Sequence, residues 1–263
     1  EFRAAPPRPT AIDAMRSLLL LEEELALEAA APRVLAAPAP PVCHGFEFIE
    51  FAVDAETRPR LTSMFETMGF AHVGTHRSKD VTLHRQGDVN LILNAEKDSF
   101  AHSFFLLHGP SVCALALRVG DGHGAMERAL RYKAQTFRGK VGPNELVIPA
   151  IRAHEGSLIY LVDRFGEDGT IYDVDFRPAD APAVAGCGLT RIDHIAQVMP
   201  RSQFDGALLF YRSVFGFDAE PAFEMIDPYG LIQSRVVESR ERSICMPLTG
   251  TRRSWRPCTR IRC

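Results

Sequence analysis

The chain has 263 residues, enough for one large domain or two ordinary ones and for a sizeable hydrophobic core. Hydrophobic residues make up 46% of the sequence and charged residues 24%, a balance that is typical of soluble globular proteins and excludes wholesale disorder. A formal net charge of −3 provides no basic field for nucleic acid or an anionic membrane, and no apolar run approaches the roughly 20 residues of a membrane helix. We therefore expect neither a nucleic-acid nor a membrane partner.

The six cysteines are scattered without C-x-x-C spacing, which argues against a zinc or thioredoxin-type motif. Several lie in apolar runs, where a reduced, buried thiol is the favoured interpretation. The N-terminus has no charged start, apolar stretch and small-residue cleavage site of a signal peptide. We expect a cytoplasmic protein.

The first 43 residues differ in character from the rest. Residues 11–31 carry apolar side chains at helical spacing and are rich in the helix formers Ala, Leu and Glu. Residues 32–41 contain four prolines, which predict a stiff, extended linker. A lone helix is not a domain, so residues 1–43 are either an extension or the end of a domain that precedes them together with its linker.

Residues 44–180 are predicted to form an N-terminal domain of two similar units. The first unit begins with a strand and a helix that ends at Met68-Gly69-Phe70, where glycine is a helix stop. The second has a helix over 125–135 between two strands. The strands are expected at 46–53, 81–86, 89–94, 112–119 and 157–163.

Residues 188–248 begin the same pattern again. A strand is expected over 188–199, and a helix over Phe204–Phe215 that ends in Phe215-Gly216-Phe217. From Phe46 to Phe70 is 24 positions, and from Ile192 to Phe217 is 25. Further strands are expected at 231–239 and 243–248. The recurrence predicts a βαβββ unit that needs a partner copy to bury its open side.

Residues 249–263 form an atypical tail with five arginines, two cysteines and the single tryptophan. A basic nucleic-acid arm is one interpretation. The tail begins where the third unit should continue, however, and its composition is typical of GC-rich DNA read out of frame. We favour a frameshifted end.

The middle of the chain resembles 4-hydroxyphenylpyruvate dioxygenase, a member of the vicinal-oxygen-chelate superfamily. The resemblance rests on segments that follow one another in order: FEFIEFAV (46–53), THRSKDVTLHRQGDVNLILN (75–94), HGPSVCALALRV (108–119), YLVDRFG (160–166) and RIDHIAQV (191–198). It implies an α+β protein of repeated βαβββ modules, three of the family's four being present.

A closer resemblance is to the dioxygenase-like half of bacterial fusion proteins that carry a 3-dehydroshikimate dehydratase barrel. VGPNE (141–145), DPYGLIQSR (227–235) and the helix with its Pro-rich linker carry this resemblance. It implies that residues 1–43 are the end of the barrel and its tether. The barrel would use its own divalent metal.

The family holds Fe(II) with two histidines and a carboxylate on one side of the metal, leaving open positions for a 2-oxo acid and O₂. The resemblance makes His194, in the Asp-His-Ile motif, the first of these ligands. Period-two spacing places Ile192, His194 and Ala196 on one strand face. The matching position of the first module is Phe48, so modules one and two are expected to be metal-free.

The second histidine and the glutamate belong to the family's fourth module, which we expect to be missing. No Asp-His-Ile-like motif follows residue 198, and the last acidic residue is Glu241. The resemblance also implies substrate-pocket roles for Ser234 and Pro247, thirteen positions apart. Thr249 stands where the family has an asparagine and receives no role.

Two functions remain open. In the first, the chain is a truncated relative of an Fe(II) dioxygenase of 2-oxo acids, inactive by itself and without stably bound metal. In the second, it is a scaffold or oligomerisation half that supports a dehydratase barrel. In both, an unpaired third module leaves an apolar face and a strand edge exposed, so we expect self-association into a homo-oligomer.

Overall fold

The computed structural model describes residues 37–167, 169–180, 186–227 and 230–251. The chain divides into two units, Glu1–Ala37 and Pro38–Cys263. The predicted helix at 11–31 lies outside the described residues, as do most of the linker and residues 252–263 of the predicted tail. All of the described helices and strands belong to the second unit.

The first segment of this unit has the predicted strand–helix–three-strand order. Strands β3 and β4 have the predicted bounds, because a tight turn separates two short apolar runs. An additional strand, β2, follows the helix. The elements are β1 (Cys43–Ala52), α2 (Arg58–Thr67), β2 (Ala71–His76), β3 (Val81–Gln86) and β4 (Val89–Asn94).

The second segment repeats this order after a connecting helix, α3 (Phe100–His108), which the sequence analysis did not predict. Its own helix is capped at the N-terminus by Asp121, whose side chain accepts a hydrogen bond from the Gly124 N–H. The elements are β5 (Ser111–Val119), α4 (Gly122–Arg131), β6 (Thr136–Phe137), β7 (Ala150–Arg152) and β8 (Leu158–Val162). Helix α5 (Ile171–Asp175) and strand β9 (Phe176–Pro178) end the segment.

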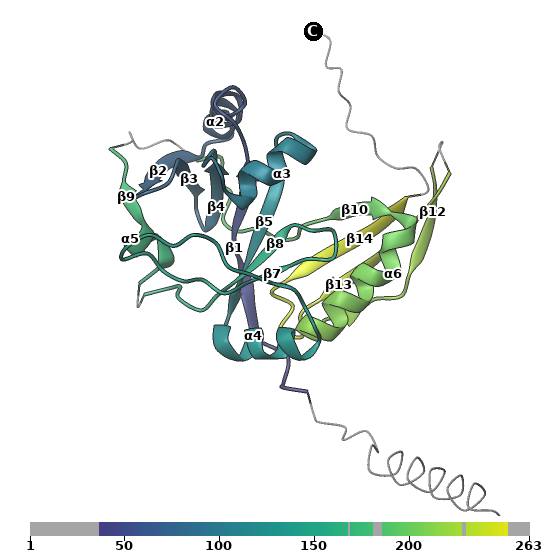
Figure 1. Ribbon diagram of the computed structural model, residues 1–263. Coiled ribbons are helices and arrows are strands. Elements are labelled where there is room, and N and C mark those ends of the chain that lie inside the picture. The colour runs from purple at the N-terminus through teal and green to yellow at the C-terminus, as the bar shows by residue number, and fades with distance from the viewer. Residues whose placement is uncertain (1–36, 168, 181–185, 228–229, 252–263) are drawn as a thin grey trace, which may run out of the picture. The chain divides into compact units, whose positions relative to one another are not determined.

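These strands form one sheet in the order β6-β7-β8-β5-β1-β4-β3-β2-β9 (Figure 1). The first strands of the two segments, β1 and β5, are antiparallel neighbours in its centre. Each is also paired in parallel with the last strand of its own segment, β1 with β4 and β5 with β8. The two segments are thus joined through their first strands.

The third segment forms a separate sheet in the order β10-β14-β13-β11, with β12 paired to β13. Here too the first strand, β10, is parallel to the last strand, β14. Its elements are β10 (Gln197–Pro200), α6 (Arg201–Phe210), the π-helix η1 (Tyr211–Phe215), β11 (Asp218–Ala219), β12 (Phe223–Asp227), β13 (Gly230–Glu238) and β14 (Cys245–Thr251). Strand β14 includes the first three residues of the predicted tail. The protein is an α+β protein with mixed sheets.

The helices of the first and third segments end in the same way. Gly69 has φ 83° and Gly216 has φ 68°, left-handed values that glycine adopts without the steric cost of a side chain. At Gly216 a Cβ would also lie 2.5 Å from Cγ of Pro40. The two matching glycines were therefore correct predictors of the helix ends.

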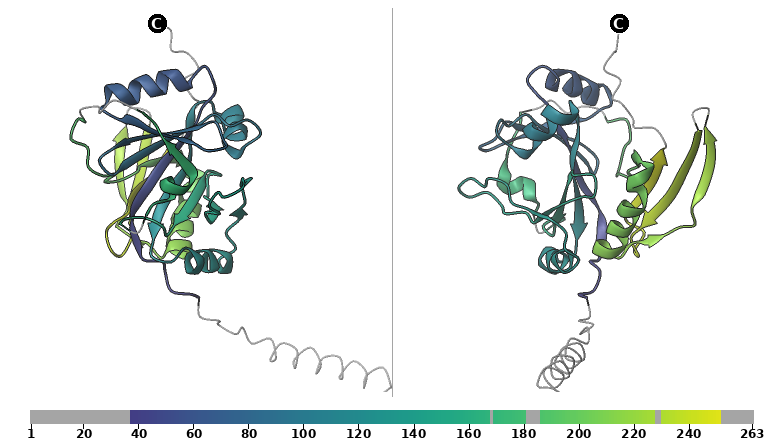
Figure 2. Two further views of the ribbon diagram at one scale, coloured as in Figure 1. Left: turned by 90° about the vertical axis from the view of Figure 1, so that its left-hand side faces the viewer. Right: turned by 45° about the vertical axis from the view of Figure 1, so that its right-hand side comes forward.

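The main core lies between the two sheets, where α6 and η1 pack (Figure 2). Phe46, Leu117 and Leu161 of the nine-stranded sheet share this core with Phe204 and Leu248 of the third segment. The third segment therefore buries one face of its sheet against the rest of the unit, through its helix.

Arg128 of α4 joins the same two parts by hydrogen bonds. Its buried guanidinium donates to the carbonyl oxygens of Ser213 at 2.8 Å, Val214 at 2.9 Å and Pro38. These bonds satisfy carbonyls at the end of η1, which lack partners within the helix.

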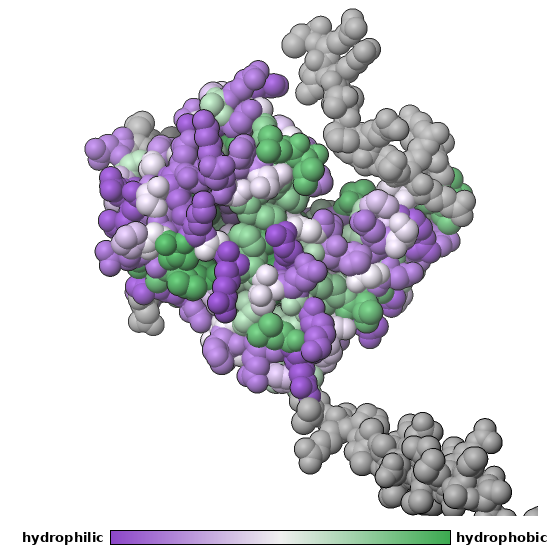
Figure 3. Space-filling view, in the orientation of Figure 1, coloured by the Kyte–Doolittle hydropathy of each residue, from purple (hydrophilic) through white to green (hydrophobic). Residues whose placement is uncertain are grey.

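The surface seen in Figure 3 is mainly hydrophilic, with separate hydrophobic patches. One patch lies over α3, where Leu106 and Leu107 are exposed. Every helix in the described ranges is too short or too polar to cross a membrane.

His84 of β3 is a buried histidine, 1% exposed, whose Nδ1 has no hydrogen-bond partner among the described residues. Burial, and secondarily the nearby His72, lowers the pKa of His84 from 6.5 to about 4. Since the unfolded chain takes up this proton near pH 6.5, the folded state binds fewer protons below that pH. The free energy of unfolding is therefore unaffected by this histidine above about pH 6.5. It falls as the pH drops toward 4, by up to about 3 kcal/mol.

We therefore expect the stability difference between wild type and His84→Gln to shrink by that amount between pH 7 and pH 4. Urea denaturation across this range measures the difference. His123→Gln, which changes an exposed histidine, is the control and should leave the pH dependence unchanged. An identical pH slope in wild type and His84→Gln would contradict the expectation.

Candidate functional site

His194, the predicted iron ligand, lies in a segment that leads into β10 without belonging to it. The predicted strand over 188–199 is wrong for most of its length, because β10 begins at Gln197. The Ile195 N–H donates to the Cys245 carbonyl at 3.2 Å, so the chain runs beside β14 before regular pairing starts. Ile192 packs into cores that include residues of the nine-stranded sheet. Its apolar side chain therefore belongs to this packing and not to a strand of the second sheet.

Exposure alternates along this segment. Ile195 and Met199 pack into the core with α6, whereas Ala196 and Val198 are exposed, Val198 by 59%. The side chain of His194 is 53% exposed. His194 and Ala196 are both exposed, as predicted for residues on one strand face. Ile192 packs against the core, so the prediction that it shares this face is wrong.

The two predicted substrate residues lie on neighbouring strands, Ser234 on β13 and Pro247 on β14. Ser234 pairs with Thr249, and Val236 pairs with Pro247. Directly opposed residues of antiparallel strands share a face, and residues two apart on a strand do too. Ser234, Val236, Pro247 and Thr249 thus occupy the face of the sheet that points away from α6.

We call this the open sheet face; it also includes Val198, which pairs with Thr249, and Phe223, which pairs with Ser234. Phe223 is 46% exposed. The hydroxyl of Ser234 is buried, donates to the Leu248 carbonyl at 3.3 Å and lies 3.2 Å from Oγ1 of Thr249. A hydroxyl has two lone pairs, so Ser234 retains acceptor capacity for a ligand.

The described residues do not by themselves fit an Fe(II) ion. Nδ1 of His194 lies 2.9 Å from Oδ2 of Asp193, an exposed carboxylate. No group of three His, Cys, Asp or Glu residues within the described ranges is arranged to hold a metal ion. His194 is also the last histidine of the sequence. A single histidine supplies one of the three protein ligands of such a centre.

In the first segment, Phe48 is 4% exposed and packs in a cluster on the nine-stranded sheet. Next to it, Glu50 of β1 is buried and accepts a hydrogen bond from the Asn94 amide at 2.6 Å. Burial raises the pKa of Glu50, and the Asn94 hydrogen bond and the charge of Lys79 only partly offset this effect. Sequence analysis missed this polar pair, because its members are 44 residues apart.

Lys79, in the turn between β2 and β3, has a structural partner. Lys79 Nζ lies 2.7 Å from Oε2 of Glu145, which also accepts from the Gly142 N–H at 2.6 Å and from Ser78. Burial raises the pKa of Glu145, but these hydrogen bonds outweigh it and lower that pKa to about 2.

All three segments pair their first strand in parallel with their last, which defines an α+β protein built from a repeated unit with mixed sheets. A family model described as "Hydroxyphenylpyruvate dioxygenase, HPPD, N-terminal" matches residues 38–177, more than half of the chain. The chain therefore belongs to the hydroxyphenylpyruvate dioxygenase family.

Two curated relatives and one solved structure extend this result. The chain is 51% identical over 254 residues to 3-dehydroshikimate dehydratase of Pseudomonas aeruginosa, and covers 40% of that protein. It is 44% identical over 207 residues to 4-hydroxyphenylpyruvate dioxygenase of Pseudomonas sp. (strain P.J. 874), covering 57% of it.

The solved structure is a "xylose isomerase-like TIM barrel/4-hydroxyphenylpyruvate dioxygenase fusion protein", which matches 94% of this chain at 46% identity with a TM-score of 0.71. This chain covers 40% of that structure. It therefore spans less than half the length of the fusion protein and of the dehydratases that it matches.

Proposed function

We propose that this chain is the dioxygenase-like part of a fusion protein with 3-dehydroshikimate dehydratase activity. It provides three of four βαβββ modules: the metal-free pair and the first module of the metal-binding pair. The observation that carries the proposal is the 51% identity to 3-dehydroshikimate dehydratase of Pseudomonas aeruginosa. The pairing of the first strands supports the number of modules. Strands β1 and β5 join two modules, whereas β10 pairs only with β14 among the described strands.

The open sheet face supports the assignment of the third module. His194 precedes β10 on its exposed side, and Ser234 and Pro247 lie on the same sheet. In the complete family member, His194 would be one Fe(II) ligand, and Ser234 and Pro247 would contact a 2-oxo acid. Since the described part offers one ligand, we infer that the chain alone does not consume O₂ with such a substrate.

A second candidate function is a scaffold that steadies a dehydratase barrel. One edge of β10 is unpaired among the described strands, and the side chains of Val198, Phe223 and Met225 are exposed. Both observations favour the scaffold, because such surfaces associate with further strands or with a second copy. In this alternative the chain contributes to assembly and not to chemistry.

Oxygen uptake with 4-hydroxyphenylpyruvate and added Fe(II) distinguishes the two functions. The chain is compared with a version extended after Thr251 by the corresponding C-terminal residues of the P. aeruginosa dehydratase. We expect uptake only from the extended protein, and loss of that uptake in its His194→Ala variant. His123→Ala is the matched control. An extended protein that gains a defined oligomeric state but takes up no oxygen would favour the scaffold instead.

A further inference from the structure

Two adjoining cavities lie on the face of the nine-stranded sheet opposite the main core. They have volumes of about 150 Å³ and 340 Å³. Seven residues line both, so the cavities form one site with an inner and an outer lobe: Glu50, Lys79, Asn94, Phe137, Gly139, Lys140 and Tyr160.

The inner lobe has mainly apolar walls. Phe48, Val81 and Ile92 of the sheet form its floor, and Leu146 and Ile148 lie among its other lining residues. A cavity of about 150 Å³ with such walls has room for a benzene ring. The lobe therefore suits one aromatic ring.

Polar groups lie where the two lobes meet. Glu50 and Asn94 are hydrogen-bonded to each other at 2.6 Å. The Tyr160 hydroxyl has no hydrogen-bond partner among the described residues. Burial raises the pKa of Tyr160, and the nearby Glu50 and Cys113 raise it further. Because burial favours the neutral form of Glu50, its carboxyl group can donate as well as accept a hydrogen bond. A ligand hydroxyl would find both donors and acceptors here.

Basic side chains predominate in the outer lobe. Lys97, Arg138 and Lys140 line it, and none of them forms an ion pair within the described part of the chain. Two further carboxylates line the lobe, and one of them, Glu96, is bound by the Asp80 N–H at 2.7 Å. The excess of free cations favours an anionic group at this end.

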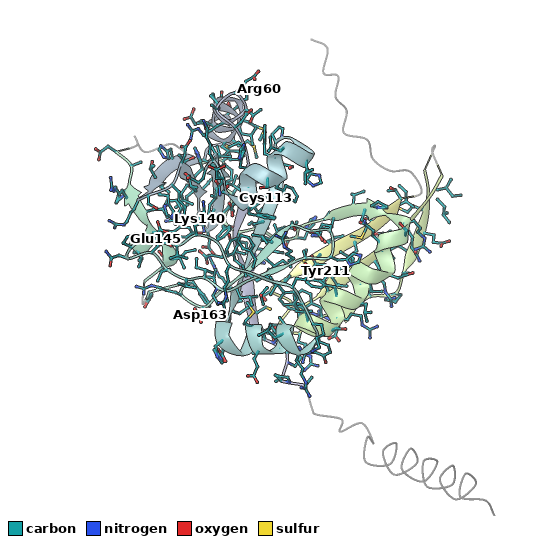
Figure 4. The ribbon with its side chains drawn as sticks, viewed as in Figure 1. Arg60, Cys113, Lys140, Glu145, Asp163 and Tyr211 are labelled. Carbon is teal, nitrogen blue, oxygen red and sulfur yellow. The ribbon has the colours of Figure 1, made fainter. Side chains whose placement is uncertain are left out.

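The segment 138–149 lines the cavity and carries Lys140 and Glu145, which are labelled in Figure 4. Two contacts tether this segment. Glu145 holds it to Lys79, which lies between β2 and β3, and the Leu146 N–H donates to Oδ1 of Asp175 at 3.0 Å. This segment contains the VGPNE motif, for which the proposed function gives no role. Its tethering preserves the cavity by keeping Leu146 in the wall.

We propose that this cavity is a binding site for a small aromatic acid that carries a hydroxyl group meta to its carboxylate. The ring occupies the inner lobe with its substituted edge toward the junction of the two lobes, where its hydroxyl bonds to Tyr160 and Glu50 and its carboxylate points toward Lys140. The site is independent of the open sheet face and of the function proposed for it.

Isothermal titration calorimetry of the full chain with 3-hydroxybenzoate and with benzoate tests the proposal. Tyr160→Phe removes only a hydroxyl without a protein partner among the described residues, so it retains the ring contacts. We expect it to weaken binding of 3-hydroxybenzoate about tenfold, as the loss of one hydrogen bond predicts, and to leave benzoate unchanged. Lys140→Ala should weaken both acids several-fold, whereas Arg131→Ala, an exposed cation on α4, should weaken neither.

Leu146→Trp fills the inner lobe and should abolish binding of both acids, with the fold checked by circular dichroism. Absence of binding by wild type at millimolar concentrations would overturn the proposal, as would binding that survives a folded Leu146→Trp. Equal losses for the two acids in Tyr160→Phe would overturn the assigned orientation. The Tyr160→Phe comparison remains decisive even where Leu146→Trp does not fold.

Discussion

Replacing Arg118 with alanine is expected to lower the free energy of unfolding by about 3–5 kcal/mol, because it leaves a buried carboxylate without its cation. Glu47 is 1% exposed, and its Oε2 accepts a hydrogen bond from Nε of Arg118. The other guanidinium nitrogens bond to Asp88 at 2.6 Å and 2.7 Å. The Asp88 hydrogen bonds and the Glu47 contact raise the pKa of Arg118 against the effect of burial, so the cation is firmly held.

Urea denaturation of Arg118→Ala measures this loss, with Arg58→Ala as the control. Arg58 also pairs with an aspartate, Asp80, but that pair is exposed and should contribute less than about 1 kcal/mol. Adding Glu47→Gln to Arg118→Ala should recover part of the loss, since the buried charge is then removed. Equal losses in the two single arginine variants would show that burial of Glu47 is not the cause.

Tyr211→Ala is expected to cost about 3–5 kcal/mol, the usual range for removing a large buried aromatic side chain. Tyr211 lies in η1, is 0% exposed and belongs to the core between the two sheets. Its ring stacks with Phe215 and Phe217, with centroids 6.2 Å and 6.1 Å away. The cavity would open where the third segment meets the nine-stranded sheet.

Tyr211→Phe separates the ring from the hydroxyl. The hydroxyl donates to Oε1 of Gln197 at 3.0 Å, so its removal should cost only about 1 kcal/mol. Thermal and urea unfolding of both variants give the comparison. A loss in Tyr211→Phe as large as that in Tyr211→Ala would mean that the hydrogen bond, and not the packed ring, joins the two parts.

Short-range patterns predicted much of this fold. Strands β3 and β4 were located correctly by their apolar runs, and Gly69 and Gly216 marked the ends of matching helices. Helix α3 was missed because its run of phenylalanine and leucine has no clear polar face. Its start is fixed by Ser99, whose side chain accepts from the His102 N–H at 3.1 Å, a signal that is weak without helical periodicity.

Short-range patterns did not reveal the candidate sites, which depended on family resemblance and on strand pairing in the structure. His194, Ser234 and Pro247 were identified by family resemblance, and their roles stay predictions. The strand expected around His194 was wrong, because Ile192 packs into cores beside the nine-stranded sheet. The cavity with Glu50, Asn94 and Tyr160 was not visible in the sequence, since strand pairing across the sheet brings these residues together.

Anaerobic equilibrium dialysis against Fe(II) tests most directly whether this chain carries only the first ligand of an iron centre. We predict no stoichiometric iron on the chain alone, and one equivalent on the version extended after Thr251. His194→Ala in the extended protein should remove that iron. One equivalent bound by the unextended chain, or iron retained by the extended protein without His194, would contradict the assignment of His194 as one ligand of an incomplete iron centre.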